Sequence, residues 1–191
     1  MRRLMFILVV LALSAGTASA QRYLPGQRGV EFTGGFVDGL KFKKQDGQAF
    51  YGNISLSTYN KKANRWVFGA EYMQRRFEYR NTLLPVVQIT AEGGHYLMFL
   101  SDASKTVFFS VGVSAMTGYE TLNWGDRNLG DGARIKDKDG FIYGGAVSFE
   151  IETYLSDRVV FLVRARERVI FGSAVGNFHF QLGAGIKIMI K

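Results

Sequence analysis

The sequence predicts an all-β fold, namely an eight-stranded antiparallel up-and-down β-barrel of the outer-membrane type. Three observations predict it: apolar and polar side chains alternate along eight segments, the apolar faces are bulky, and the two sets of connections differ in length. A side-chain period of two is typical of strands, and a membrane barrel turns one face of each strand toward lipid and the other toward the interior. The 16 Phe, 9 Tyr and 23 Gly, with only 2 Pro, suit long strands in a curved wall.

The last segment shows the alternation most clearly. Every second residue from Phe178 to Ile190 is apolar, whereas His179 and Gln181 are among the residues between them. In a helix the same residues would spread around the whole circumference and leave no apolar stripe. The run 181–188 also resembles the carboxy-terminal signal by which outer-membrane barrels are recognised for insertion, although the chain ends in Ile190 and Lys191 rather than in an aromatic residue.

Seven further segments alternate in the same way. Val, Phe, Ile, Tyr and Trp dominate one face of these segments, and Gly, Ser and charged residues are common on the other. Gly34, Gly35 and Gly39 in the first segment allow the tight curvature of a small barrel. In the fourth segment the alternation blurs toward Met98. The expected strands are 30–42, 50–59, 65–79, 85–100, 106–122, 141–155, 159–171 and 178–190.

The connections fall into two classes. Three are tight and rich in turn residues, namely 60–64, 101–105 and 156–158. The complementary set is looser and contains one long loop; it comprises 43–49, 80–84, 123–140 and 172–177. Outer-membrane barrels have short periplasmic turns and longer outer loops. The sequence therefore predicts that the tight turns and both termini lie on the periplasmic side.

The first twenty residues have the three parts of a secretory signal peptide. Arg2 and Arg3 form a positive region, residues 4–13 are apolar, and Ala18-Ser19-Ala20 is a small-residue cleavage site. The apolar run is too short to span a bilayer as a helix, which takes about 20 residues. We expect cleavage after Ala20 and a mature chain, 21–191, that forms a single β-barrel domain.

The amino-acid composition limits which classes of protein and of binding partner are possible. The chain has no cysteine, which excludes a lipid-modified amino terminus and a disulfide framework. Cleavage removes two of the 24 Lys and Arg residues and none of the 16 Asp and Glu residues, which leaves a net charge of +6. Such an excess permits contact with lipopolysaccharide phosphates, an acidic partner or DNA, but it specifies none of them.

Alternation alone also permits a soluble eight-stranded barrel of the lipocalin kind, with its apolar face inward. Residue size favours the membrane barrel, because the bulky apolar face would overfill an eight-stranded interior. Several strands also exceed the usual length of about 5 to 6 residues in globular proteins. The opposite face suits a cramped lumen because it contains the small residues Gly112, Ser114, Gly118, Gly144, Ala146, Ser148, Gly183 and Gly185.

The inward face of the predicted barrel carries a set of charged residues. Glu150 and Glu152 lie on a hairpin with three arginines of the next strand, which allows cross-strand pairing. A narrow lumen must pair its charges, so we expect a structural plug of salt bridges rather than an ion pathway. The predicted network comprises Glu71, Arg75, Glu92, Glu120, Glu150, Glu152, Arg164, Arg166, Arg168 and Lys187.

Candidate chemistry is sparse. His95 and His179 are the only histidines and no cysteine accompanies them, so we expect no transition-metal site. The run 137–140 lacks the glutamate and the spacing of a calcium loop, which makes it a turn. Glu92, His95 and Ser101 form a conceivable hydrolase set, but no spacing rule supports it. We therefore expect no catalytic residues, no cofactor and no small-molecule substrate.

Several segments carry a resemblance to a known family. They are 18–22 (ASAQR), 24–31 (LPGQRGVE), 93–96 (GGHY), 108–112 (FFSVG) and 152–158 (ETYLSDR). With these segments the chain resembles the TraO family of conjugative-transposon transfer proteins of Bacteroides-type bacteria. The resemblance implies an envelope component of a DNA-transfer apparatus related in role to type IV secretion, and it carries over no functional residue.

These observations together predict a non-enzymatic barrel in the lipid of the cell outer membrane. We expect it to anchor or organise other envelope proteins of a conjugation apparatus without binding nucleic acid directly, since an eight-stranded wall leaves no pore for DNA. Two alternatives stay open. One is a small OmpA-like structural or adhesive barrel with no part in conjugation, and the other is a secreted soluble ligand-binding barrel.

Overall fold

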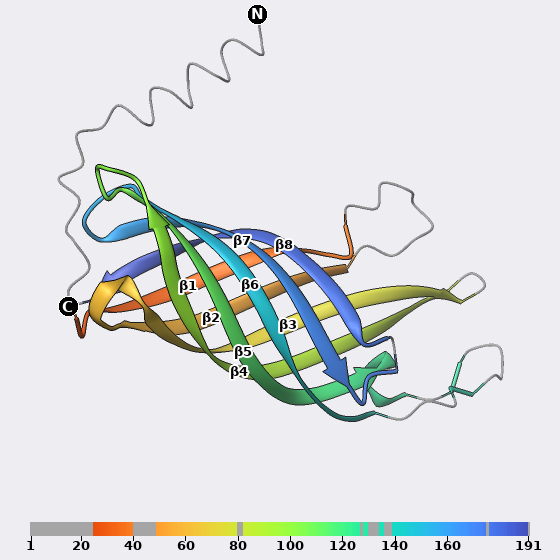
Figure 1. Ribbon diagram of the computed structural model, residues 1–191. Helices are drawn as coiled ribbons and strands as arrows, with labels where there is room; N and C mark the ends of the chain where they lie inside the picture. The colour runs from red at the N-terminus through yellow and green to blue at the C-terminus, as the bar shows by residue number, and fades with distance from the viewer. Residues whose placement is uncertain are drawn as a thin grey trace, which may run out of the picture.

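Eight antiparallel strands form a closed barrel in the order of the sequence, with β1 also paired to β8 (Figure 1). The computed structural model describes residues 25–39, 49–79, 82–126, 128–129, 134–135, 139–174 and 176–190. The strands are β1 (Arg28–Val37), β2 (Ala49–Tyr59), β3 (Arg65–Tyr79), β4 (Thr82–Ser101), β5 (Val107–Leu122), β6 (Gly140–Tyr154), β7 (Val159–Phe171) and β8 (Phe178–Ile190). Two short 3-10 turns are η1 (Lys61–Ala63) and η2 (Asn123–Gly125). The predicted fold class is confirmed. The predicted signal peptide, 1–20, lies outside the described residues.

Among the residues that the structure describes, no helix has the length and apolarity needed to cross a membrane. Three strands, β3, β7 and β8, have the bounds expected from the sequence. The first strand is shorter than expected, because the backbone turns at Asp38 and Gly39, which have φ of 55° and 87°. Residues 40–42, which the sequence also assigned to this strand, lie outside the described residues.

The expected loop 80–84 was wrong. Pairing between β3 and β4 continues through Phe77 with Leu84 and Glu78 with Leu83 to Tyr79 with Thr82. Because β2 pairs with β3 only as far as Gln74, these last pairs form a hairpin that projects beyond the neighbouring strands (Figure 1). The register between the strands, which the sequence does not state, decided this boundary.

A β-bulge in β4 explains why the alternation blurs near Met98. The pairing between β4 and β5 shifts by one residue between Met98 and Leu100. A bulge inserts one extra residue and so breaks the period of two. Leu97, Phe99 and Leu100 are consequently all on the outer surface, with exposed fractions of 49%, 58% and 54%.

The two faces of the wall have opposite chemistry. Large apolar side chains lie outside, where Phe178 and Phe141 are 69% and 66% exposed, whereas Glu150 and Lys187 inside are 0% exposed. This arrangement is the reverse of a soluble barrel, whose apolar face points inward. One carboxylate departs from it, because Glu167 is exposed on the outer face opposite Val147 and Phe180.

The interior is layered along the barrel axis. An apolar cluster near the tight turns contains Tyr59, Phe108, Tyr154, Val160, Leu162 and Met189. Two smaller apolar clusters near the looser connections contain Val37, Ala49, Tyr51 and Met73 in one and Met116, Ile142, Ala146 and Ile170 in the other. Most buried charged residues lie between these layers, whereas Glu120 lies beside the connection that follows β7. Side chains therefore close the polar part of the lumen at both ends.

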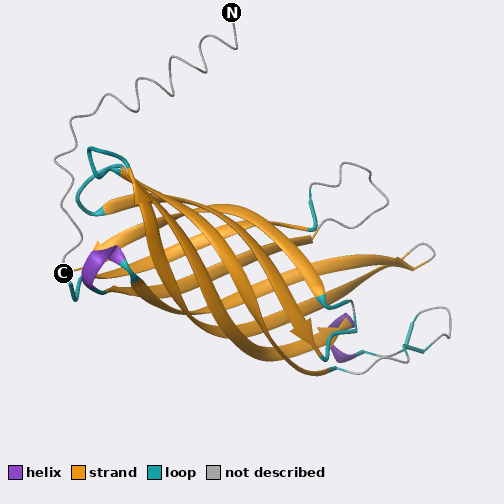
Figure 2. Cartoon of the chain, in the orientation of Figure 1, coloured by secondary structure: helices purple, strands orange, loops and turns teal. Residues whose placement is uncertain are grey.

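The three tight turns lie at one rim of the barrel and the other four connections at the opposite rim, where the connection between β3 and β4 is shorter than predicted. β1 begins and β8 ends at the rim with the tight turns, including η1, and η2 lies at the opposite rim (Figure 2). Side chains brace the tight turns: the Asp102 carboxylate accepts hydrogen bonds from the backbone N–H groups of Thr106 and Val107 at 2.6 and 2.8 Å. We call these the turn rim and the loop rim.

A glycine makes room for one of the largest side chains in the lumen. Gly112 on β5 pairs with Tyr96 on β4, and a Cβ atom at Gly112 would lie 2.6 Å from two ring carbons of Tyr96. The same ring lies under two arginines, with its centroid 4.6 Å from Cζ of Arg65 and 5.6 Å from Cζ of Arg164. Tyr96 therefore contacts both the wall, at Gly112, and the charged side chains of the lumen, at Arg65 and Arg164.

Gly112→Ala should destabilise the barrel by about 1 to 3 kcal/mol, because the added methyl group overpacks the lumen and displaces Tyr96. The matched control is Gly52→Ala, since a Cβ atom there would meet nothing within 4 Å. The measurement is the temperature at which the compact, heat-modifiable band disappears in a detergent gel. Equal temperatures for the two variants would contradict this account of Gly112.

Candidate functional site

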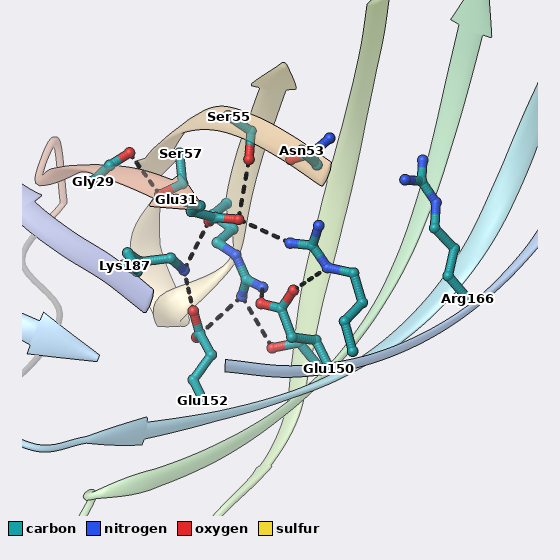
Figure 3. A network of polar contacts seen from close by, with 12 residues as sticks. Gly29, Glu31, Asn53, Ser55, Ser57, Glu150, Glu152, Arg166 and Lys187 are labelled. Atoms are coloured by element: carbon teal, nitrogen blue, oxygen red, sulfur yellow. Dashed lines mark hydrogen bonds and ion pairs between the residues drawn. The ribbon is translucent and has the colours of Figure 1, made fainter. Parts of the chain in front are cut away.

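Six charged side chains form a closed ring of ion pairs in the lumen. Figure 3 shows Glu31 of β1, Glu150 and Glu152 of β6, and Lys187 of β8 converging there. Arg164 Nη2 on β7 lies 2.8 Å from Glu31 Oε2 on β1, and Arg164 Nε lies 2.5 Å from Glu150 Oε2 on β6. Arg164 thus joins two carboxylates across the barrel. The members of this ring are Glu31, Arg65, Glu150, Glu152, Arg164 and Lys187.

The other half of the ring runs through β3 and β8. Arg65 Nη2 pairs with Glu150, and Arg65 Nη1 lies 3.2 Å from Glu152 Oε2. Lys187 Nζ pairs with Glu152 Oε1 and lies 2.9 Å from Glu31 Oε1, which closes the ring. Acid and base therefore alternate around the ring, and each charge contacts two of opposite sign.

A second, open chain of ion pairs lies on the loop-rim side of the ring. Arg166 pairs with Glu92 through Nη2, and its Nη1 lies 3.1 Å from Glu71 Oε2. Arg168 Nη1 lies 2.7 Å from Glu71 Oε1. Glu71 therefore joins the two arginines, and Glu92 ends the chain with Arg166 as its cationic partner.

Neutral side chains complete the hydrogen bonding of the carboxylates. Asn53 Nδ2 donates to Glu92 Oε1 and Gln181 Nε2 donates to Glu71 Oε1, both at 2.9 Å. The Tyr59 hydroxyl donates to Glu152 Oε1 at 3.0 Å. Such bonds matter because a buried carboxylate has lost its water and each unsatisfied oxygen would raise the free energy of the folded state.

The two clusters are electrically neutral together. They contain five carboxylates and five cations, and the most exposed of the ten, Glu92, is only 8% exposed. Ion pairs that are fully desolvated tolerate no unpaired member, because an uncompensated buried charge costs several kcal/mol. The arrangement is a filled lumen in which each charge is held by its neighbours.

The structure brings eight of the ten charged residues proposed from the sequence into these clusters. The expected hairpin pairing occurs between Glu150 and Arg164, which face each other in the register of β6 and β7. Glu152 pairs instead with Arg65 and Lys187. The two residues that the clusters do not include are Glu120 and Arg75.

Sequence reasoning missed two members of the ring, Glu31 and Arg65. Both are 0% exposed, and Arg65 contacts two glutamates. Each is one residue away from an outward aromatic, Phe32 or Trp66, so strict application of the period of two would have placed both inside. The predicted set already held five acids and five bases, so its charge balance gave no sign that two members were missing.

Glu120 binds the connection between β7 and β8 at the loop rim. Its Oε2 accepts hydrogen bonds from Ser173 Oγ at 2.6 Å and from Gln88 Nε2 at 2.7 Å. Its Oε1 accepts a hydrogen bond from the Ala174 backbone N–H at 2.8 Å. These bonds draw residues after β7 over the mouth of the lumen.

Arg75 belongs to a second contact at the same mouth. Its Nη1 lies 2.7 Å from Asp38 Oδ2. His179 Nδ1 lies 3.2 Å from the same oxygen, and His179 Nε2 lies 3.1 Å from the Gly176 carbonyl. Asp38 also accepts a hydrogen bond from the Phe180 backbone N–H at 3.0 Å. The ends of β1, β3 and β8 are thereby joined where the barrel opens.

The conceivable hydrolase set is separated by the wall. Glu92 faces the lumen, whereas His95 faces outward and packs on Trp66, with ring centroids 4.6 Å apart. Within the described part of the chain, no group of three His, Asp or Glu side chains has an arrangement that could hold a metal ion. Asp139 accepts a hydrogen bond from the Leu122 backbone N–H at 2.8 Å, and Asp137 and Lys138 lie outside the described residues.

The fold is similar to that of solved outer-membrane barrels. The crystal structure of Neisserial surface protein A matches with a TM-score of 0.56 and 13% identity, covering 88% of this chain and 99% of that chain. Ail, the attachment invasion locus protein of Yersinia pestis, matches with a TM-score of 0.49 and 13% identity over 86% of this chain and 100% of that one. The N-terminal β-barrel domain of Pseudomonas aeruginosa OprF matches with a TM-score of 0.44 and 11% identity, covering 86% of this chain and 99% of that chain. At this identity the first match shows the fold alone.

The family is shown by sequence. None of the curated proteins matches this chain. The family model of the conjugative transposon protein TraO, however, matches residues 24–190, nearly the whole chain and all eight strands of the barrel. The resemblance noted in the sequence is thereby confirmed, and the chain belongs to the TraO family of conjugative transposon proteins.

Proposed function

We propose that this protein is a non-enzymatic outer-membrane component of a conjugative transfer apparatus, related in role to type IV secretion, that anchors or organises other envelope proteins. One observation carries the proposal: the lumen is filled by paired charges, so the wall and the two rims are the surfaces left for interaction. Membership of the TraO family supports the assignment to conjugative transfer.

The outer face supports residence in the membrane. Its bulky side chains, such as Val113 at 60% and Phe68 at 57%, are exposed over the whole circumference and would be costly in water. Most strands also exceed the length of about 9 to 11 residues that a transmembrane strand needs. The signal peptide expected at 1–20, with cleavage after Ala20, supplies a route to the cell envelope.

The interior argues against a conduit. An eight-stranded barrel has an interior just wide enough for side chains. Here the centre is occupied by the two neutral ion-pair clusters and both ends by apolar layers. DNA therefore passes elsewhere in the apparatus, and this chain contributes position and contacts.

Removing one cation from the open chain should destabilise the barrel strongly. In Arg166→Met, Glu92 loses its cationic partner inside the lumen, and the expected cost is about 3 to 5 kcal/mol. The double variant Arg166→Met/Glu92→Gln should recover part of this loss, because it removes the orphaned charge. The measurement is the midpoint of urea unfolding in lipid vesicles.

Arg75→Met is the matched control for that series. Its pair with Asp38 is only partly buried, with side chains 19% and 26% exposed, so its loss should cost less than about 1 kcal/mol. If Arg166→Met proves as mild as Arg75→Met, the lumen does not depend on paired charges and the argument for a sealed centre fails.

Deletion of the gene should reduce conjugative transfer to background, because the apparatus would lose an envelope anchor. The measurement is mating frequency, with the full chain returned in trans as the control. The returned protein should fractionate with outer membranes and resist carbonate washing. Unchanged mating frequency would contradict the proposal and favour a structural or adhesive barrel, whereas release by carbonate would favour the soluble alternative.

A further inference from the structure

Four exposed cationic side chains are distributed around the turn rim. Among the side chains that the structure describes, each of the three tight turns contributes one, and the start of β1 contributes the fourth. All four are exposed, and none forms an ion pair with another described residue. We call this set the basic rim; its members are Arg28 at the start of β1, Lys62 between β2 and β3, Lys105 between β4 and β5, and Arg158 between β6 and β7.

The turns present these side chains in defined positions. Lys62 and Lys105 have φ of 63° and 54°, in the left-handed region that non-glycine residues rarely adopt. Lys105 N–H also donates to the Asp102 carbonyl at 3.1 Å. In the third turn, Ser156 Oγ accepts hydrogen bonds from the backbone N–H groups of Arg158 and Val159 at 3.4 and 3.2 Å. Lysine therefore occupies two turn positions where glycine or asparagine would be less strained.

Little negative charge offsets the basic rim. Two acids are described among the tight turns, Asp102 and Asp157, and the Asp102 carboxylate already accepts two backbone hydrogen bonds within its turn. At the loop rim the described charges are balanced, since Arg75, Arg76 and Arg134 occur with Asp38, Asp126 and Asp139. Among the described residues, the exposed positive excess is therefore concentrated at the turn rim.

The shape of this rim indicates what it would bind. The cluster of Tyr59, Phe108 and Tyr154 with its neighbours closes the lumen just inside the turns, so a ligand would lie across the rim rather than enter it. The cations are spread over four connections and do not converge on one point, which suits an extended anionic surface better than a small anion. Lys62, Lys105 and Arg158 also lie beyond the last strand pairs, past the apolar part of the wall.

We propose that the basic rim is the docking surface for an acidic, Asp- and Glu-rich surface of a periplasmic partner protein. This inference rests on the proposed function, because it names the kind of partner that the barrel would anchor. Complementary charge steers such an encounter and fixes its orientation. Fixed cations in each turn would hold the partner centrally over the closed end of the barrel.

The test uses the full chain in nanodiscs of zwitterionic phosphatidylcholine and poly-L-glutamate as the probe. The rim variant is Arg28→Gln/Lys62→Asn/Lys105→Asn/Arg158→Gln, in which asparagine is chosen because it tolerates the left-handed backbone. The matched control is Arg76→Gln/Arg134→Gln, which removes two exposed cations of the loop rim. Wild type should bind the probe with an affinity that falls as salt rises, and the rim variant should lose about tenfold or more through reduced electrostatic attraction.

Two binding results would overturn the inference. One is equal affinity of the rim variant and wild type for poly-L-glutamate. The other is stronger competition for the wild-type rim by phosphatidylglycerol vesicles or duplex DNA than by the acidic polypeptide, since that would identify a lipid-facing or nucleic-acid-facing surface. A control variant that binds like wild type shows that the effect belongs to the turn rim.

Mating assays separate this inference from the proposed function. The rim variant should reach the outer membrane at wild-type level, keep its heat-modifiable band and yet transfer less than the control variant. If deletion abolishes transfer and the rim variant transfers like wild type, the docking surface is wrong and the proposed function stands. If deletion itself leaves transfer unchanged, the proposed function fails whatever the binding result.

Discussion

Charge neutrality among buried side chains is the constraint on which this structure depends. Five carboxylates and five cations share the lumen, and Arg164 alone links Glu31 to Glu150. Stripping water from each ion is expensive, and only close contact with opposite charge offsets it. The wall must therefore close with the register that brings these residues together, since any slip by one residue would turn charged side chains toward lipid.

The need to hold large charged side chains in the lumen also determines which residues pack in the wall. The long charged side chains and the tyrosines beneath them occupy volume that an eight-stranded barrel has only where its wall residues are small. Gly112 leaves room for the Tyr96 ring, which contacts two arginines. Gly183 likewise leaves room for Tyr51, whose hydroxyl would lie 2.3 Å from a Cβ atom added at Gly183. Outside, no such limit applies, so the bulky apolar residues occupy the other face.

Because side chains fill the lumen, the outer wall and the two rims are the surfaces left for interaction. The ion pairs occupy the lumen and so block passage through the barrel. At the loop rim, Glu120 accepts hydrogen bonds from Ser173 and Ala174, which narrows that opening further. What distinguishes the two rims is then charge and length of connection. Among the described residues, the turn rim has an excess of exposed cations, whereas the charges of the loop rim are balanced.

The sequence itself determined much of the fold, because the alternation of side chains with a period of two is a local property of each strand. It assigned the fold class and the bounds of β3, β7 and β8, and it indicated pairing between the glutamates of β6 and the arginines of β7. The structure shows this pairing for Glu150 and Arg164, which are 14 residues apart on one hairpin. Only the tertiary structure decided which distant charges meet, such as Glu31 and Arg164, 133 residues apart. It also decided the extension of the hairpin at Leu83 and Leu84. These features depend on barrel closure and strand register. Both arise from contacts across the lumen, which produce no periodic pattern in the sequence.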